Sequence, residues 1–216
     1  MAKKFVNDLR YLFEDPELDL VFDAVELKFR IRQPGKKEFT FQTLSSGYSA
    51  IFDIYANLII RTEYFEITPE QLTGVVFIDE IDVHLHVSLQ RKILPFFARS
   101  FPNIQFIATT HSPFVVTSAF DTLIYDLNTG QQSDNLSMYS VETVVEGLLG
   151  VSPVSEQLQD KIKKLVNLTS NDSFNMYEAQ TILSYLEPYS ETLDAESRMF
   201  YEIALNKTIK QRSTEI

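Results

Sequence analysis

The sequence has 216 residues, of which 44% are hydrophobic and 23% are charged, and it contains no Cys and no Trp. A chain of this length and composition can form a globular core without disulfides or a structural metal. The absence of Cys excludes a disulfide framework, a Cys-ligated zinc site and a thiol nucleophile. The net charge of −11 disfavours direct binding to a phosphate backbone, because such binding depends on Lys and Arg.

No segment of the sequence predicts contact with a membrane. Its apolar runs are far shorter than the roughly 20 residues that a membrane-spanning helix needs. The N-terminal segment MAKKFVNDLR lacks the apolar core of a signal peptide. We therefore expect a cytoplasmic protein.

The first predicted element is a β-hairpin. Apolar and charged residues alternate over Ala24–Arg32, which is the period of a half-buried strand. Gln33–Lys36 carries a Pro-Gly turn signal, and Phe39–Phe41 alternates again. The outer face of this hairpin is predicted to be basic, with Lys28, Arg30 and Arg32. This face is either exposed to solvent or in contact with nucleic acid or an acidic partner.

A helix is predicted after the segment Leu44–Gly47. Ser45 or Ser46 can serve as its N-cap. One face of this helix is apolar and consists of Ile51, Ile54, Tyr55, Leu58 and Ile59. The periodicity indicates that this face packs into the core.

The middle of the chain has the pattern of an α/β fold. Gly74–Ile78 and Ile104–Ala108 are short continuous apolar runs, which are typical of strands buried on both faces. A helix is predicted between them over 87–98, a short helix after Pro113, and a further strand at Thr122–Leu127. This alternation predicts a parallel sheet covered by helices.

The polar loop 128–137 is taken as the boundary between two domains, 1–135 and 136–216. The second is predicted to be all-helical, with helices over 141–149, 155–168, 177–186 and 195–212. It contains no catalytic constellation. Its predicted packing residues are Ile182, Leu183, Tyr185 and Leu186.

Polar residues follow both central strands where each strand ends. Asp79-Glu80 follows the first, and Thr110-His111 follows the second. Ligands of parallel α/β sheets bind outside the carboxyl ends of the strands. One carboxylate can hold Mg²⁺ through water while its neighbour orients an attacking water, as phosphoryl transfer requires. A strand-end His can hydrogen bond to a phosphate or hold a carboxylate in place.

Four segments, taken in order, resemble motifs of ABC-type ATPases. Leu44–Gly47 resembles the signature motif, and Val75–Glu80 resembles the Walker B strand. Ile81–His86 resembles the following loop in the H-L-H form of the overcoming-lysogenization-defect (OLD) and RecF-like ATPases. Ala108–Pro113 resembles the switch-histidine segment. The resemblance covers about 39–127 and extends to the ATPase subunits of Septu-type anti-phage systems.

The resemblance implies a role for each motif residue. Asp79 would bind Mg²⁺ through water, Glu80 would be the general base, and His111 would sense the γ-phosphate. The signature residues Ser45, Ser46 and Gly47 would bind the γ-phosphate of ATP that is held by a second protomer. Asp82 and His86 would also contact nucleotide. Backbone N–H groups at a helix start form an anion site, and Gly permits close approach.

The sequence departs from the family pattern at three positions near these motifs. Tyr48 replaces Gln or Glu, His86 stands where an aspartate is common, and Val87 replaces a frequent Pro. His84 and His86 also form an alternating pair, for which a zinc or iron site is the less favoured alternative.

The largest departure is a missing motif. No G-x-x-x-x-G-K-[S/T] phosphate loop occurs, and only 43 residues precede Leu44. The sequence therefore resembles the C-terminal half of an ATPase, a partial P-loop NTPase. We expect ATP and Mg²⁺ to bind only together with a Walker A-containing half or protomer, in a head-to-tail dimer. Nucleic acid would be reached only through that complete assembly, and the isolated chain would hydrolyse little or no ATP.

Two other functions fit the same residues. The chain could be a non-enzymatic interaction or regulatory module that keeps the ATPase fold. It could also be a metal-dependent nuclease that uses Asp79, Glu80 and His111.

Overall fold

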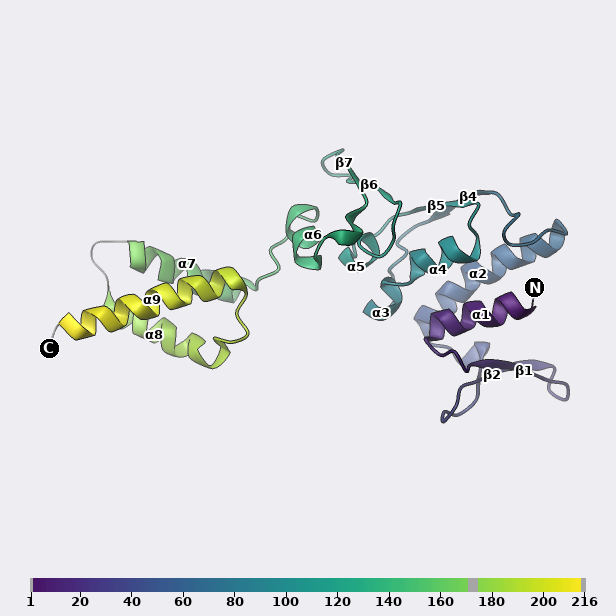
Figure 1. Cartoon of the computed structure of the whole chain (residues 1–216), viewed down its shortest axis with the longest axis horizontal. Coiled ribbons are helices and arrows are strands. Elements are labelled where there is room, and N and C mark those ends of the chain that lie inside the picture. The colour runs from purple at the N-terminus through teal and green to yellow at the C-terminus, as the bar shows by residue number, and fades with distance from the viewer. Residues whose placement is uncertain (1, 171–174, 215–216) are drawn as a thin grey trace. The chain divides into compact units, whose positions relative to one another are not determined.

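The computed structural model describes residues 2–170 and 175–214. The chain divides into two compact units with the boundary between Gly150 and Val151 (Figure 1). The predicted boundary lay fifteen residues earlier, at 135/136. Helix α6 (Val141–Gly147) belongs to the first unit because Val144 is buried together with Leu136 and Val116.

The first unit begins with a helix for which the sequence analysis predicted no element, α1 (Ala2–Phe13). Its side chains Leu9 and Leu12 are almost fully buried. Asp8 is also buried, and its carboxylate accepts a hydrogen bond of 2.7 Å from the hydroxyl of Tyr55. This bond satisfies both polar groups inside an apolar core.

The predicted hairpin is part of a three-stranded antiparallel sheet. Its strands are β1 (Asp19–Asp23), β2 (Lys28–Arg32) and β3 (Phe39–Thr40), in that order. The prediction of strand over Ala24–Leu27 was wrong, because these residues form the β1–β2 turn. The Asp23 carboxylate stabilises the turn by accepting hydrogen bonds from two backbone N–H groups within it, and these bonds lower the pKa of Asp23.

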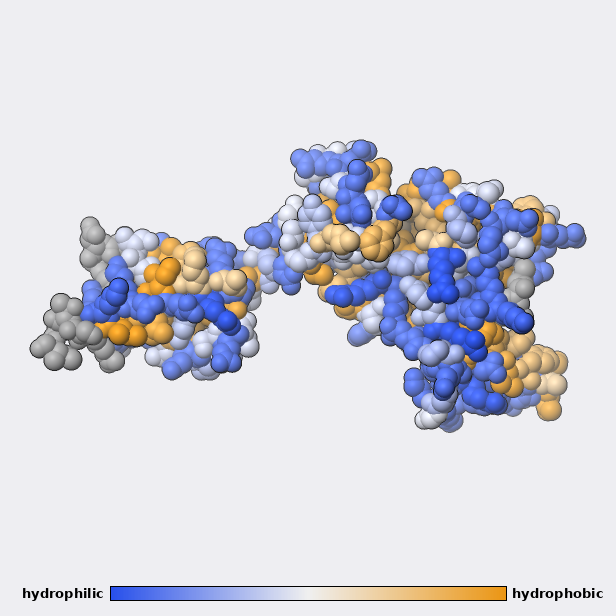
Figure 2. Space-filling model, viewed as in Figure 1, coloured by the Kyte–Doolittle hydropathy of each residue, from blue (hydrophilic) through white to orange (hydrophobic). Residues whose placement is uncertain are grey.

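The basic residues of β2 are paired with acidic residues of the same sheet. Arg30 forms ion pairs with Asp23 and Glu26, and Arg32 pairs with Glu38. The ammonium nitrogen of Lys28 lies 3.8 Å from a carboxylate oxygen of Glu26. This face therefore carries compensated charge, which disfavours the alternative of a nucleic-acid contact. The surface of this sheet also carries exposed apolar side chains at its turn (Figure 2), namely Phe22, Val25, Leu27 and Phe29.

Helix α2 (Ser46–Tyr64) confirms the helix predicted after Leu44–Gly47. Ser45 occupies its N-cap position, but the Ser45 side chain makes no capping hydrogen bond. The predicted apolar face packs into the main core, with Ile51, Tyr55 and Leu58 buried.

The strands β4 (Gly74–Ile78) and β5 (Ile104–Ala108) pair in parallel, as predicted. The prediction that these two strands are buried on both faces was wrong. One face packs on the core, whereas the other is open, with Val75 52%, Phe77 76% and Ile107 42% exposed. Apolar faces of parallel sheets are ordinarily covered, and the described residues form only two strands here.

The helix predicted over 87–98 is interrupted. It consists of α3 (Val87–Gln90) and α4 (Ile93–Ser100). Pro95 explains the break, because proline has no N–H to donate to the carbonyl of Arg91. In Figure 1, α4 lies beside β4 and β5.

The strand predicted at Thr122–Leu127 does not join the parallel sheet. It forms β6 (Leu123–Tyr125), which pairs antiparallel with β7 (Gln132–Asp134), so the predicted loop 128–137 contains a strand. Gly130 has a positive φ of 70° in the connecting turn, a conformation that glycine adopts at little cost. The short helix predicted after Pro113 is present as α5 (Pro113–Val116) and begins at Pro113 itself.

The second unit is helical, as predicted. Its helices are α7 (Glu156–Ser170), α8 (Met176–Leu186) and α9 (Ala195–Thr214). Ile182, Leu183 and Leu186 are buried in its core. Tyr185 was predicted to pack there, but it is 47% exposed. Its hydroxyl accepts a hydrogen bond from Gln157, and the ammonium group of Lys161 lies 3.9 Å from its ring centroid.

No helix in the described ranges combines the length and the hydrophobicity needed to cross a bilayer.

One ion pair of the first unit should be visible in acid titrations. The ammonium group of Lys4 lies 2.8 Å from Glu70, and its hydrogen bond is the main cause that lowers the pKa of Glu70 from 4.5 to about 2. A depressed carboxyl pKa stabilises the fold above pH 4.5, and this stabilisation is lost as the pH falls toward 2. In Lys4→Met, NMR titration should therefore show a higher pKa for Glu70. Lys37→Met is the control, and an unchanged Glu70 pKa in Lys4→Met would contradict the assignment.

Candidate functional site

The carboxyl ends of β4 and β5 bring two chain segments together. Residues 79–82 follow β4 and residues 109–112 follow β5, and we call these two segments the sheet edge. Asp79 and Glu80 are both exposed there. Asp79 continues the strand pattern on the same face as the exposed side chains of Val75 and Phe77.

A threonine that the sequence analysis did not single out holds both acidic residues. The hydroxyl of Thr109 donates a hydrogen bond of 2.5 Å to one carboxylate oxygen of Asp79. The same hydroxyl accepts a hydrogen bond of 2.7 Å from the backbone N–H of Glu80. Its role could not be seen in the sequence, because it depends on the parallel pairing of the two strands.

Glu80 has an unusual backbone conformation. Its φ is 50°, which is uncommon for a residue with a side chain and costs about 1–3 kcal/mol. His84, farther along the same loop, also has a positive φ of 65°. Such conformations persist only where surrounding contacts hold them.

A second hydroxyl makes the next link across the sheet edge. Thr110 donates a hydrogen bond to the Asp82 carboxylate and accepts one from the N–H of Ser112. The hydroxyl of Ser112 bonds in turn to Gln90, which donates to the carbonyl of Leu85. The loop that follows the predicted Walker B strand and the segment predicted to carry the switch histidine are therefore joined by side-chain hydrogen bonds.

The three histidines do not take part in a metal-binding cluster within the described residues. His86 is the N-cap of α3, and its Nδ1 accepts from the N–H of Ser88. His111 is exposed, two residues after Thr109. Within the described residues, no three His, Cys, Asp or Glu side chains are placed to hold a metal ion. The structure thus brings Asp79 and Glu80 together with Thr109, and it does not assemble them with His111 into a metal site.

The signature-like turn combines exposed serines with a buried glycine. Ser45 and Ser46 are exposed at the start of α2, whereas Gly47 is buried. A Cβ atom on Gly47 would lie 2.8 Å from the backbone carbonyl oxygen of His84. Gly47 is therefore required for close packing against the loop after Glu80, a reason that the sequence analysis did not give.

Tyr48, which differs from the residue that the resemblance implies at this position, has a packing role. Its ring stacks on Phe13, with centroids 4.5 Å apart and planes inclined by 4°. Burial raises the pKa of the Tyr48 hydroxyl. The residue thus ties the start of α2 to the end of α1.

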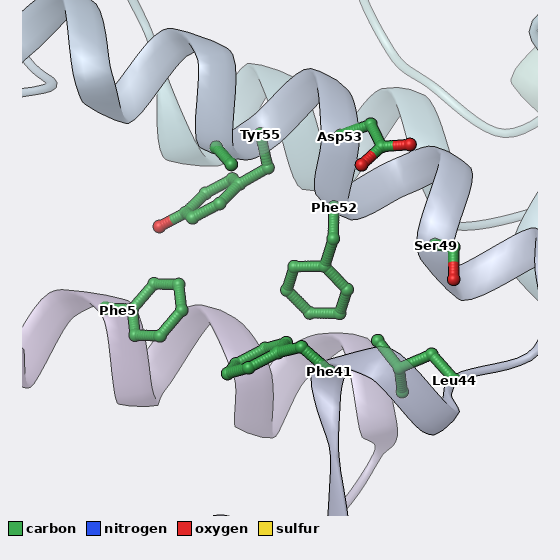
Figure 3. A pocket seen from close by; sticks show the side chains of 8 residues that line it. Phe5, Phe41, Leu44, Ser49, Phe52, Asp53 and Tyr55 are labelled. Atoms are coloured by element: carbon green, nitrogen blue, oxygen red, sulfur yellow. The ribbon is translucent and has the colours of Figure 1, made fainter. Parts of the chain in front are cut away.

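A groove of about 290 Å³ lies beside this turn (Figure 3). Phe5 comes from α1, Phe52 and Tyr55 come from α2, and Leu44 closes one end. The lining includes one charged residue, Asp53, and no Lys or Arg. The groove therefore does not provide the cations that a triphosphate requires.

The packing of Gly47 leads to a stability prediction. Gly47→Ala should destabilise the first unit by about 1–3 kcal/mol, because the added methyl group overlaps a backbone atom that cannot rotate away. Gly147→Ala is the matched control, since nothing lies within 4 Å of its Cβ position at the end of α6. It should stabilise by about 0.4–1 kcal/mol. Urea unfolding measures both, and equal effects would contradict the packing role.

The donor set fits one part of a Mg-ATP site. The Asp79 carboxylate offers oxygen atoms of the kind that Mg²⁺ prefers. The hydrogen bond from Thr109 engages one oxygen of Asp79 and leaves the other available. The sequence contains no phosphate loop, so these residues do not by themselves provide groups that would cradle a triphosphate.

Comparison with known proteins identifies the family. Residues 5–117, just over half of the chain, match the family described as "AAA domain, putative AbiEii toxin, Type IV TA system". The chain belongs to this AAA-domain family. The match includes α2, both parallel strands and the whole sheet edge.

Relatives of this AAA-domain protein include probable ATPases. It is 29% identical over 190 residues to the Retron Ec83 probable ATPase of Escherichia coli, covering 82% of this chain and 33% of that protein. It is 35% identical over 128 residues to the Retron Vc95 probable ATPase of Vibrio cholerae serotype O1 biovar El Tor, covering 58% and 24%. The Septu protein PtuA of Bacillus thuringiensis is 31% identical over 130 residues, covering 53% and 33%.

These alignments span only a quarter to a third of each relative's length. The predicted relationship to Septu-type proteins is confirmed at this level. Among solved structures, the SMC head domain from Thermotoga maritima aligns with a TM-score of 0.42 and 19% identity, covering 61% of this chain and 45% of that one. This similarity is too low to say anything about function.

Proposed function

We propose that this AAA-domain chain supplies part of a composite ATPase site. In this proposal, Asp79 holds Mg²⁺ through water, Glu80 is the general base, and His111 contacts the γ-phosphate. The observation that carries the proposal is the hydrogen-bonded pair of segments at the sheet edge, where Thr109 fixes Asp79 and Glu80 together. Bound Mg²⁺ would neutralise negative charge on the phosphates. The residues of this chain would orient the attacking water and accept its proton.

The exposed serines of the signature-like turn fit a role toward a second nucleotide. Ser45 and Ser46 lie at the positive end of α2, a helix of 19 residues, which favours an anion. We propose that this end, together with Gly47, meets the γ-phosphate of ATP held by another protomer. Asp82 and His86 of the neighbouring loop are proposed to contact nucleotide. The assembly is then a head-to-tail dimer.

The open face of β4–β5 supports the need for a complementary segment. Its side chains Val75, Phe77 and Ile107 are exposed although they are apolar. This face leads directly to Asp79 at the strand end. A Walker A-bearing segment packed there would cover the face and deliver its phosphate loop to the carboxylates.

A nucleotide titration tests the proposal. A fluorescent ATP analogue with Mg²⁺ is added to the chain alone and to the chain with the product of the gene directly upstream. We expect no saturable binding by the chain alone and Mg²⁺-dependent binding by the pair. ATP turnover by the chain alone that disappears in Glu80→Gln would overturn the proposal.

A second function is supported by two observations. Gly47 packs against His84, and His86 caps α3, so both motif residues have structural roles that need no nucleotide. A non-enzymatic interaction module with this fold would keep them. An upstream frame without G-x-x-x-x-G-K-[S/T], together with no nucleotide binding by the pair, would favour this second function.

A further inference from the structure

We propose that Thr109 is the positioning residue of the sheet edge, fixing Asp79 and Glu80 in one arrangement through a single hydroxyl. The inference deepens the proposed function and rests on it. It rests also on a set of contacts that can be measured in the chain without nucleotide.

Thr109 bonds to four consecutive residues that start at the end of β4. Its N–H donates to the carbonyl of Ile78, and its carbonyl accepts from the N–H of Ile81, both at 3.0 Å. Between these two backbone bonds, its hydroxyl bonds to Asp79 and Glu80, at 2.5 and 2.7 Å. All the hydrogen-bonding groups of this threonine are therefore directed at the turn that carries the two acids.

The chemistry of the groups fixes the direction of each hydroxyl bond. A backbone N–H only donates, so the hydroxyl oxygen accepts from Glu80. An ionised carboxylate only accepts, so the single hydroxyl hydrogen points to Asp79. The hydroxyl rotor therefore has one position that satisfies both residues, and it couples the orientation of the Asp79 side chain to the backbone of Glu80.

This coupling explains how an unfavourable backbone conformation is held. Glu80 has a φ of 50°, and its own N–H is the group that Thr109 accepts from. Without the hydroxyl, this N–H loses its protein partner and the turn can relax. The Glu80 side chain would then change its orientation. The Asp79 side chain would rotate because its hydrogen bond to the hydroxyl is lost.

The first test uses amide hydrogen exchange of the chain itself, followed by NMR. In Thr109→Val, we expect the Glu80 amide to exchange roughly tenfold faster, the factor that corresponds to one hydrogen bond. The Ile81 amide should stay within about threefold of its wild-type rate, because its acceptor is a backbone carbonyl that the substitution keeps. Thr109→Ser should restore the protection of Glu80.

Thr110→Val is the matched control. It removes the neighbouring hydroxyl, which bonds to Asp82 rather than to Asp79 or Glu80. The Glu80 amide should remain protected in this variant. Unchanged protection of Glu80 in Thr109→Val would overturn the inference, as would equal loss at Glu80 and Ile81, which indicates that the whole strand end has opened.

The second test measures ATP hydrolysis by the chain combined with its Walker A-bearing partner. Thr109→Val should lower kcat by about tenfold or more with KM within about twofold, since positioning acts on the chemical step, and Thr109→Ser should recover most of the rate. Wild-type kcat in Thr109→Val overturns the positioning role while the proposed function stands. No hydrolysis by the wild-type pair overturns the proposed function, and the exchange data still decide whether Thr109 holds the turn.

Discussion

If the proposed composite site is correct, Glu80→Gln in the chain combined with the proposed Walker A-bearing partner is expected to lower kcat by about 10²–10⁴-fold, the usual contribution of a general base. The amide keeps the size of the side chain and the backbone bond to Thr109, but it cannot accept the proton of the attacking water. Binding of the fluorescent ATP analogue should therefore persist. Steady-state hydrolysis and equilibrium titration measure the two quantities separately.

The chain offers a matched control for this substitution. Glu66 is also an exposed glutamate with a positive φ, 55°, but it lies beyond the C-terminal end of α2, away from the sheet edge. Glu66→Gln should leave kcat within about twofold of wild type, as is usual for surface positions away from the chemistry. Equal losses in both variants, or no loss in Glu80→Gln, would remove Glu80 from the role of base.

Phe97→Ala is expected to have the largest effect on stability. Phe97 is fully buried on α4 and stacks on Phe106 of β5, with centroids 5.4 Å apart. Truncation of a buried Phe costs about 3–5 kcal/mol, because the lost contacts leave a cavity. The unfolding transition of the first unit should shift in urea by the corresponding amount.

A more conservative substitution at position 97 and the unfolding of the separate helical unit provide the controls. Phe97→Leu keeps much of the side-chain volume and should cost considerably less than Phe97→Ala. The helical unit after Gly150 has its own core, with Leu165 fully buried. If the Phe97→Ala loss does not exceed that of Phe97→Leu, then Phe97 does not carry the contact between α4 and β5.

The elements with strong periodicity were predictable from the sequence. The helix after Ser45, the two strands around 74–78 and 104–108, and the three helices of the second unit are all present. Their apolar spacing fixes the type of element, and in the helix after Ser45 it also identifies the buried face; it did not reveal that one face of the two strands is open. The turn at Ala24–Leu27 was missed because its alternation mimics a strand, whereas side-chain bonds from Asp23 close it.

The candidate site was predictable only in part. The acidic pair and the histidine could be found because polar residues follow apolar strands. Thr109 could not, since its role depends on the parallel register that places Ile78 beside Ala108. The packing of Gly47 on His84 also joins residues far apart in the sequence, and no local pattern encodes such a contact.

The two-stranded sheet also determines how the purified protein should behave in solution. Within the described residues, β4 and β5 have no further strand beside either of them, so no strand pairs with the backbone donors and acceptors on their outer sides. Other copies of the chain can pair with these groups, and the adjoining apolar face makes this more favourable. Storage at high concentration should therefore promote self-association, and coexpression with the proposed Walker A-bearing segment should reduce it.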